Sequence, residues 1–509
     1  MNRLHPYITY SEALVMLENG LAKPDEILSQ HLEEEIEIGL SSFRVFPSES
    51  IEGKEKIKYQ FGKIEKGKAE EGIFLAPNII STDMLAKNTW KAAHQLIEKN
   101  RHESLDKGEN ATMAQSPLSG EYLSFSTNGG IGRGKPKSNI REMSLSIITT
   151  LTPSKPCLQD RGDNTCIIPD LPTDKMIDFI RFFKEMTYHK TSEGIDYGRV
   201  KQEEKGKGTN KTISYKPIRP QRFQGNFPNP PRSTTLGSIA LLATIGEFTK
   251  EAEFSEIATI VLDSLKETTI YLIKYGDAKT FTYNHFIIDL AKQGNLRQIV
   301  DSLYYSKLYN QTFRDYKNTE YQKFDLFTSR FLQLFNRAAF RDFLAFRAEY
   351  PTEVKLLFKT YFEKMEKIDS EIVTSARHLG RWLNLVAYHT AKREIKEGSQ
   401  NYWEKIREQK AKVLVELESS TFSAKSGDAI IAQVVTRAGR LSGMDAPSEA
   451  TLFMEKTSSG ELPIDQARNL LIAFSRLKNV KEEKQDTEEG NTKSVSSSSE
   501  QEQNNYQDS

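Results

Sequence analysis

The chain has 509 residues, and its 70 Lys and Arg residues balance 70 Asp and Glu residues. This length predicts two to four domains, at about 100–200 residues per domain, and allows a large core without disulfides or metal ions. The zero net charge excludes a uniformly basic protein that coats nucleic acid, although it leaves room for locally basic surfaces. Two cysteines, Cys157 and Cys166, are too few for a disulfide framework or a four-thiolate zinc site.

The first 196 residues predict a mixed α/β domain. Short apolar stretches broken by Gly, Pro, Asn and Ser predict strands at Gly72–Pro77, Glu121–Ser126 and Glu142–Leu151. Apolar residues at helical spacing predict helices at Asp83–Lys99 and Thr173–Met186, the second with Thr173 as its N-cap.

Residues 197–232 form a basic connector. Gly, Pro and basic residues dominate it, and the aromatic residues Tyr215, Phe223 and Phe227 lie among them. This composition predicts a flexible segment, which suits either an arm that orders on nucleic acid or a plain linker.

From Thr234 to about Lys478 strand patterns almost disappear, and helical spacing predicts an all-α part. Ser255–Tyr275, Lys323–Phe346 and Ile368–Arg393 carry the clearest patterns, whose aromatic residues we assign to the core. We divide this part into a helical domain at 233–364 and a helical bundle at 365–480, followed by a disordered acidic tail at 481–509. The predicted fold class is therefore α+β.

No motif typical of catalysis is present. The eight histidines form no His-Glu-x-x-His pair, and there is no Gly-x-Ser-x-Gly elbow. We therefore predict a protein that is not an enzyme and uses no metal or other cofactor. No apolar run is long enough to span a bilayer and no signal peptide is seen, so we also predict a cytoplasmic protein without a membrane partner.

A Gly-rich stretch, Asn128–Ser138, matches the Gly-x-x-x-x-Gly-Lys part of a phosphate-binding loop. Pro136 stands where such a loop has the Ser or Thr that binds magnesium, so a nucleotide site is disfavoured. Glycines permit close approach of the backbone to a ligand, and the stretch and its flank carry Arg133, Lys135, Lys137 and Arg141. We interpret it as a hairpin loop that either contacts DNA or is simply solvated.

Two further groups of basic residues are candidates for binding nucleic acid. The connector contributes Lys205, Lys207, Lys211, Arg219 and Arg222. The helical part contributes Arg377, Arg381, Lys392 and Arg393, of which Arg377 and Arg381 lie one helical turn apart. Such a face suits a displaced DNA strand, although ordinary solvated helices look the same.

Two segments carry a resemblance to a known family. Asp163-Asn-Thr-Cys-Ile-Ile-Pro-Asp-Leu-Pro172, with the helix after it, resembles a stretch of the large subunit of type I CRISPR Cascade complexes. The similarity is to the myxobacterial-type and type I-B variants, some of which serve CRISPR-associated transposons. Ser375–Asn384 resembles a C-terminal helix of the same family, and the order of domains agrees.

The resemblance implies a non-catalytic large subunit of an RNA-guided DNA surveillance complex. Such a subunit recognises the protospacer-adjacent motif and the 5′ end of the guide, and stabilises the R-loop. Its partners are guide RNA, double-stranded target DNA with its displaced strand, other Cascade backbone subunits, and either a nuclease-helicase or transposition proteins. In this scheme Asn128 and Asn139 contact base edges, and Arg133, Lys135 and Lys137 contact phosphates.

Internal translation from Met365 is a further hypothesis under the resemblance, because several type I systems make a small subunit in that way. The other functions that the sequence allows are a helical scaffold or adaptor with nucleic-acid-binding arms, and an unrecognised nuclease. A steep dependence of nucleic-acid affinity on salt distinguishes the first function from a scaffold.

Overall fold

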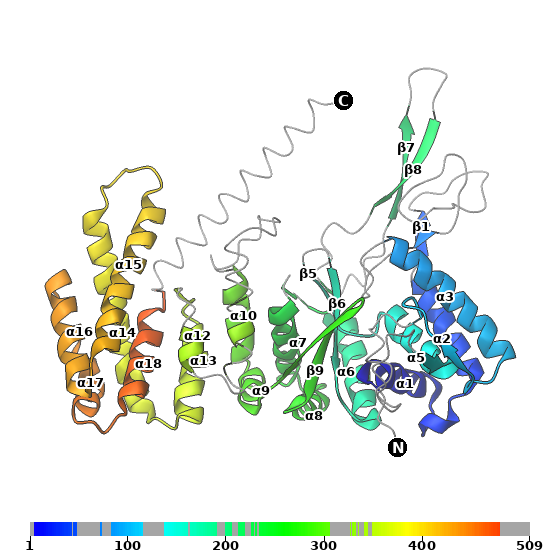
Figure 1. Ribbon diagram of the computed structural model, residues 1–509, viewed down its shortest axis with the longest axis horizontal. Helices are drawn as coiled ribbons and strands as arrows, with labels where there is room; N and C mark the ends of the chain where they lie inside the picture. Colours follow the sequence, from blue (N-terminus) through cyan, green and yellow to red (C-terminus); the bar gives the residue numbers. More distant parts are fainter. Residues whose placement is uncertain are drawn as a thin grey trace. The chain divides into compact units, whose positions relative to one another are not determined.

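The chain divides after Gln293 into two units, residues 1–293 and 294–509, in the computed structural model (Figure 1). Each unit is described by itself. The residues that the structure describes are 5–42, 44–47, 72–73, 83–115, 137–160, 163–190, 199–205, 212–218, 225–228, 230–231, 234–305, 326, 328–331, 334, 340–344 and 349–478. The expected strand at Glu121–Ser126 and the acidic tail lie outside them.

The helices of the first half of the N-terminal unit pack around one central helix. They are α1 (Pro6–Asn19), the 3₁₀ turn η1 (Pro24–Glu26), α2 (Ser29–Ser42), α3 (Asp83–His102), α5 (Ile140–Leu151) and α6 (Thr173–Lys190). Helix α5 contacts α1, α2 and α3, and α1 also packs on α6 (Figure 1). The helices predicted at Asp83–Lys99 and Thr173–Met186 are confirmed, although Thr173 is the first helical residue and not the cap before it.

The strand predicted at Glu142–Leu151 is wrong, because these residues form most of α5. Met143, Ser144, Leu145 and Ser146 alternate as a strand would, but all four are buried. A helix enclosed on every side does not show the 3.6-residue pattern that marks a helix at a surface. Three of its hydroxyls, those of Ser144, Thr149 and Thr150, bond inside the core instead of to water, and Thr149 donates to the Tyr7 carbonyl at 2.7 Å.

A four-stranded sheet forms the other half of this unit, in the order β10-β9-β6-β5. Its strands are β5 (Cys157–Asp160), β6 (Asp163–Pro169), β9 (Thr269–Lys274) and β10 (Asp277–Thr282), all antiparallel to their neighbours. The helices α7 (Thr234–Phe248), α8 (Ser255–Leu265) and α9 (His285–Lys292) also belong to this unit.

The hairpin β9–β10 corrects the prediction that strands end near Thr234. Ser255–Tyr275 was predicted as one helix, but the helix ends at Leu265 and the chain turns back at Gly276, whose φ is +81°. Strand β9 pairs on both edges, with β6 and β10, and is mostly buried. A short apolar run of this kind has no periodicity that separates a central strand from a helix.

A second sheet, in the order β2-β1-β7-β8, corrects the prediction of a wholly flexible connector. Its strands are β1 (Arg44–Pro47), β2 (Gly72–Ile73), β7 (Arg199–Lys205) and β8 (Thr212–Ile218). Residues 199–205 and 212–218 therefore pair as the two strands of a hairpin, and the first of them pairs in parallel with β1. The strand expected at Gly72–Pro77 is confirmed for Gly72–Ile73, and the residues after it are not described.

Helices make up nearly all of the described part of the C-terminal unit, as predicted. They are α10 (Asn295–Tyr305), α12 (Phe340–Leu344), α13 (Val354–Thr360), the π-helix η2 (Tyr361–Met365), α14 (Ser370–Glu394), α15 (Tyr402–Ser423), α16 (Gly427–Ser442), the 3₁₀ turn η3 (Ser448–Ala450), α17 (Thr451–Ser458) and α18 (Ile464–Ser475). Helix α14 is central, because it contacts α15, α16, α17 and α18.

Aromatic residues fill the core of this unit, as the sequence predicted. The rings of Phe340 and Phe343 pack near Phe358, and Phe358 packs against Phe474 of α18 at 6.0 Å between centroids. All four side chains are at most 2% exposed. Residues before Met365 thus build the same core as α18, which follows it by about a hundred positions.

Candidate nucleic-acid interface

Two short antiparallel strands hold the ends of the Gly-rich stretch. Strand β3 (Gly108–Asn110) pairs with β4 (Lys137–Asn139), so the two ends of the segment that connects these strands lie next to each other. The chain that follows β3 is anchored by a hydrogen bond, which the Tyr275 hydroxyl donates to the backbone carbonyl of Met113 at 2.8 Å. Of the residues proposed here, Asn128, Arg133 and Lys135 lie outside the described residues, as does the side chain of Lys137.

Asn139 and Arg141, predicted to bind nucleic acid, both have partners within the chain. The Asn139 side chain caps α5 by accepting a hydrogen bond from the Glu142 backbone N–H at 2.8 Å. The Arg141 guanidinium donates to the backbone carbonyls of Pro24, at 2.6 Å, and Ile27, at 3.4 Å. These groups position the base of the Gly-rich stretch, and we leave them out of the surface proposed below.

The hairpin β7–β8 fixes the register of several basic residues of the connector. Arg199 lies opposite Ile218, Lys201 opposite Lys216, and Lys205 opposite Thr212. Lys205 ends β7, whereas the other four candidates of the connector lie outside the described residues, namely Lys207, Lys211, Arg219 and Arg222.

The chain after this hairpin is anchored to β5. Asn226 exchanges two hydrogen bonds with the backbone of Cys157, at 2.8 and 3.1 Å, and its amide also donates to the carbonyls of Pro153 and Lys155. Phe227 is only 2% exposed. The interpretation of Phe227 as an aromatic residue of a flexible binding arm is therefore wrong, since its ring is part of the core.

One exposed line of α14 carries three basic residues. Arg377, Arg381 and Lys392 are exposed and make no hydrogen bond or ion pair with the residues that the structure describes. At 100° per residue they fall within about 60° around the helix axis, over about 22 Å of its length. Arg393, the fourth residue predicted in this helix, has a structural role, because it donates to the carbonyls of Leu441 and Ser442 at the end of α16.

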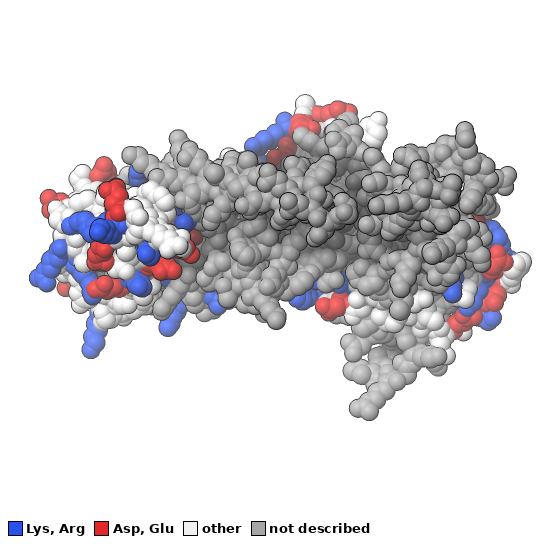
Figure 2. Space-filling model, turned by 90° about the horizontal axis from the view of Figure 1, so that it is seen from above, with Lys and Arg blue, Asp and Glu red and all other residues white. Residues whose placement is uncertain are grey.

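Charges of both signs lie on the face of the C-terminal unit that Figure 2 shows. Figure 2 shows Lys and Arg interspersed with Asp and Glu at the left of the view, with no continuous basic area. Arg437, for example, is paired with Glu416. For binding nucleic acid, the aligned basic residues of α14 are therefore more informative than the overall charge of this unit.

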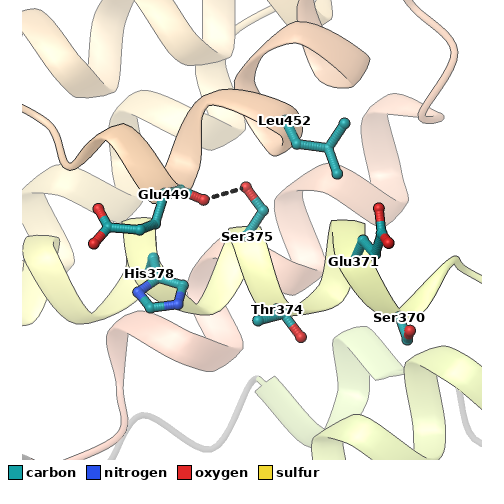
Figure 3. Close-up of a pocket in the computed structure, with 7 residues that line it drawn as sticks. All are labelled: Ser370, Glu371, Thr374, Ser375, His378, Glu449 and Leu452. Atoms are coloured by element: carbon teal, nitrogen blue, oxygen red, sulfur yellow. Dashed lines mark hydrogen bonds between the residues drawn. The ribbon is translucent and has the colours of Figure 1, made fainter.

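A shallow pocket opens beside the start of α14 (Figure 3), and its residues do not form a catalytic group. It is lined by Ser370, Glu371, Thr374, Ser375, His378, Glu449 and Leu452. The Ser375 hydroxyl is already engaged, donating to the Glu449 carbonyl at 2.7 Å and accepting from the Phe453 N–H at 3.0 Å. Among the described residues no three His, Cys, Asp or Glu side chains lie close enough to hold a metal ion.

The two cysteines lie opposite each other in β5 and β6, a pairing that the sequence analysis missed. Both are buried, and burial raises the pKa of Cys157 to about 11. The neighbouring Lys155 is fully buried, donates to the carbonyls of Thr150 and Thr152, and has a pKa lowered by burial. Since Lys155 closes the end of α5, we assign this cluster to the core.

The chain matches the family described as CRISPR-associated protein Csp2 over residues 5–478, which includes both units. It belongs to the Csp2 family. Membership indicates a subunit of a type I, Cascade-type CRISPR effector complex, which acts with guide RNA and other subunits. No curated protein and no solved structure matches the chain. Within the described residues, no helix combines the length and the apolar character that crossing a membrane requires.

The segment that carried the resemblance has a definite place in the fold. Asp163–Pro169 is β6, an interior strand between β5 and β9, and the chain then enters α6. Cys166, Ile167 and Ile168 are at most 1% exposed. The strand part of this motif therefore belongs to the core of the N-terminal unit.

Proposed function

We propose that the chain is the large, non-catalytic subunit of its effector complex, and that it recognises the protospacer-adjacent motif and the 5′ end of the guide and stabilises the R-loop. Family membership supports a role within a nucleic-acid-guided complex. The register of the β7–β8 hairpin is the observation that supports direct contact with nucleic acid.

Successive odd-numbered residues of β7 share one face of the hairpin, because strands have a two-residue repeat. Arg199, Lys201 and Lys205 therefore lie on the same face, with Lys216 beside Lys201. Glu203 is the single acidic residue among the eight at these positions. Two lysines directly opposite each other destabilise a strand pair, and a polyanion on that face relieves the repulsion.

The Gly-rich stretch and the α14 line are the other parts of the proposed surface. Asn128, Arg133, Lys135 and Lys137 belong to the stretch, which we propose as the reader of the flanking motif. Arg377, Arg381 and Lys392 follow the displaced DNA strand. Replacing Arg133 and Lys135 by alanine is expected to weaken binding of target DNA while guide RNA still loads. Unchanged affinity for the target contradicts that assignment.

The decisive experiment is purification of the tagged protein from its native operon, followed by sequencing of the RNA that accompanies it. Short RNAs of repeat-spacer form with other backbone subunits are expected. Protein without RNA contradicts the proposal.

The hairpin is tested separately with the double variant Lys201→Gln, Lys216→Gln. Removing two phosphate contacts lowers nucleic-acid affinity and reduces the slope of log affinity against log salt by about 2. Stability should not fall, because the same change removes a like-charge pair. An unchanged salt slope excludes these lysines from the interface.

Separate production of a small subunit from Met365 stays a hypothesis. Such a product would lack the contacts that residues before Met365 make with the helices after it. Lys410 loses Glu349, to which it is paired at 2.7 Å, and Phe474 loses the rings of Phe358 and Phe362. Such a product is expected to be less stable than the same helices in the full chain, unless a partner covers that face. An immunoblot of the native gene product with an antibody to the C-terminal tail shows whether it is made.

A further inference from the structure

Helix α3 carries an aromatic pair at the edge of its buried face. Trp90 and His94 lie one turn apart, with ring centroids 5.0 Å apart and planes at 64°. Trp90 is half-buried and His94 is exposed. The side of α3 that packs inside is formed by other residues, among them Ala93, Leu96 and Ile97, each at most 4% exposed. The core therefore accounts for part of the Trp90 ring but not for the position of His94 beside it.

The surroundings of α3 suit a ligand that combines phosphates with flat rings. The helix contacts β2, which belongs to the sheet of the basic β7–β8 hairpin (Figure 1). Near its other end, Lys99 forms an ion pair with Glu109 of β3, the strand that leads to the Gly-rich stretch. Helix α3 thus contacts the sheet that contains one basic segment of this unit and is paired with the strand that leads to the other.

We infer that Trp90 and His94 form a platform on which a base of single-stranded RNA stacks. Proteins that hold single strands combine cations for the phosphates with aromatic rings for the bases. The half-buried indole of Trp90 and the exposed imidazole of His94 offer such rings. The exposed Lys91 adds a cation on the same helix. This inference rests on the proposed function, in which the chain recognises the 5′ end of the guide.

Fluorescence of Trp90 tests the contact directly. The chain has three tryptophans, and the variant Trp382→Phe, Trp403→Phe leaves Trp90 as the only one. Phenylalanine suits both positions, because the buried Trp382 indole N–H has no hydrogen-bond partner among the described residues and Trp403 is half-buried. We expect short single-stranded oligoadenylate to quench the emission of Trp90, and an abasic oligomer with the same phosphates to leave it unchanged. Equal quenching by both overturns the inference.

Affinity supplies the second readout, in the full chain. Trp90→Leu is expected to weaken binding of oligoadenylate by about 5- to 150-fold, the usual loss for one stacked base, and Trp90→Phe to restore most of it. Trp403→Leu is the matched control, since Trp403 is also half-buried beside an aromatic neighbour, Tyr402, at 5.1 Å. Thermal unfolding of each variant identifies any loss that is due to misfolding.

The outcomes separate this inference from the proposed function. If Trp90→Leu binds as the parent chain does, with the same salt dependence, the stacking platform is excluded and the proposed function stands. If the parent chain binds neither oligoadenylate nor guide RNA at any salt concentration, both are contradicted.

Discussion

Arg476 and Glu418 form a bidentate ion pair in the interior of the C-terminal unit. The Arg476 Nε and Nη2 atoms donate to the two carboxylate oxygens of Glu418 at 2.7 and 2.8 Å, and both side chains are less than 10% exposed. Arg476 also donates to the Leu344 carbonyl at 2.5 Å, and its own carbonyl accepts from the Tyr350 N–H at 2.7 Å. The pair therefore joins α15 and α18 to the chain that precedes α13.

Glu418→Gln is expected to destabilise the C-terminal unit by about 3–5 kcal/mol, because it leaves the Arg476 charge buried without its counter-charge. The control is Glu416→Gln, which breaks the ion pair with Arg437, whose side chains are 42% and 50% exposed. That change should alter the free energy of unfolding by about 1 kcal/mol or less. Chemical denaturation measures both, and equal effects contradict the assignment of a buried pair.

Gly380 is the point where α14 and α18 approach each other closely. A Cβ atom at this position lies 2.5 Å from Cβ of Phe474 and 2.7 Å from its backbone carbon. Gly380→Ala is therefore expected to force the helices apart and to destabilise the unit by roughly 1–3 kcal/mol.

Gly439→Ala is the matched control for this change. Gly439 also lies within a helix, α16, but a Cβ atom there meets nothing closer than 3.9 Å. Alanine should stabilise α16 by roughly 0.5–1 kcal/mol. Opposite signs for the two variants in thermal unfolding support the close approach, and a loss for both contradicts it.

His5 makes the N-terminal unit sensitive to acid. Burial lowers the pKa of His5 from 6.5 to about 4, so between these values the unfolded chain binds a proton that the folded chain does not. The neutral His5 therefore contributes to the free energy of unfolding by at most about 3 kcal/mol. This contribution is complete above pH 6.5 and is lost as the pH falls toward 4. His5→Asn should flatten this part of the stability profile, because Asn can cap α1 as His5 does through the Tyr7 N–H but does not titrate.

Glu35 has the opposite pH dependence. Burial, and secondly the charge of Glu18, raise the pKa of Glu35 from 4.5 to about 7. The folded state therefore holds a proton that the unfolded state releases, and stability is greatest below pH 4.5 and is lost as the pH rises through 7. Glu35→Gln should be more stable than the parent chain above pH 7 and similar to it below pH 4.5. Parallel profiles for the two proteins contradict this effect.

The α14 line is expected to contribute phosphate contacts. Replacing Arg377 and Arg381 by alanine should weaken binding of single-stranded DNA and reduce the slope of log affinity against log salt by about 1.4, or 0.7 for each contact. Folding should be unaffected, because both side chains are exposed. Arg437→Ala, which removes a cation already paired with Glu416, is the control and should leave the slope unchanged.

The local pattern of apolar and polar residues was sufficient to predict a helix where one side of that helix faces water. Helices α3, α6 and α14 were predicted within a few residues, because each has a buried face and a polar face. The prediction was wrong for α5 and β9, which are enclosed and so carry no alternation between buried and exposed residues. The connector was judged by its Gly and Pro content, yet β7 pairs with β1 from about 150 positions earlier in the chain.

Local residue patterns and charge by themselves determined that this protein is α+β and which segments are basic, and two short segments with the order of domains carried the resemblance to a family. Only the tertiary structure decided which basic side chains are already hydrogen-bonded within the chain. Arg141 and Arg393 bind backbone carbonyls of distant segments, whereas Arg377 and Arg381 make no such contact with the described residues. The reason is that a guanidinium can donate to a backbone carbonyl as well as to a phosphate, and which of them it binds depends on what folding brings within hydrogen-bond distance.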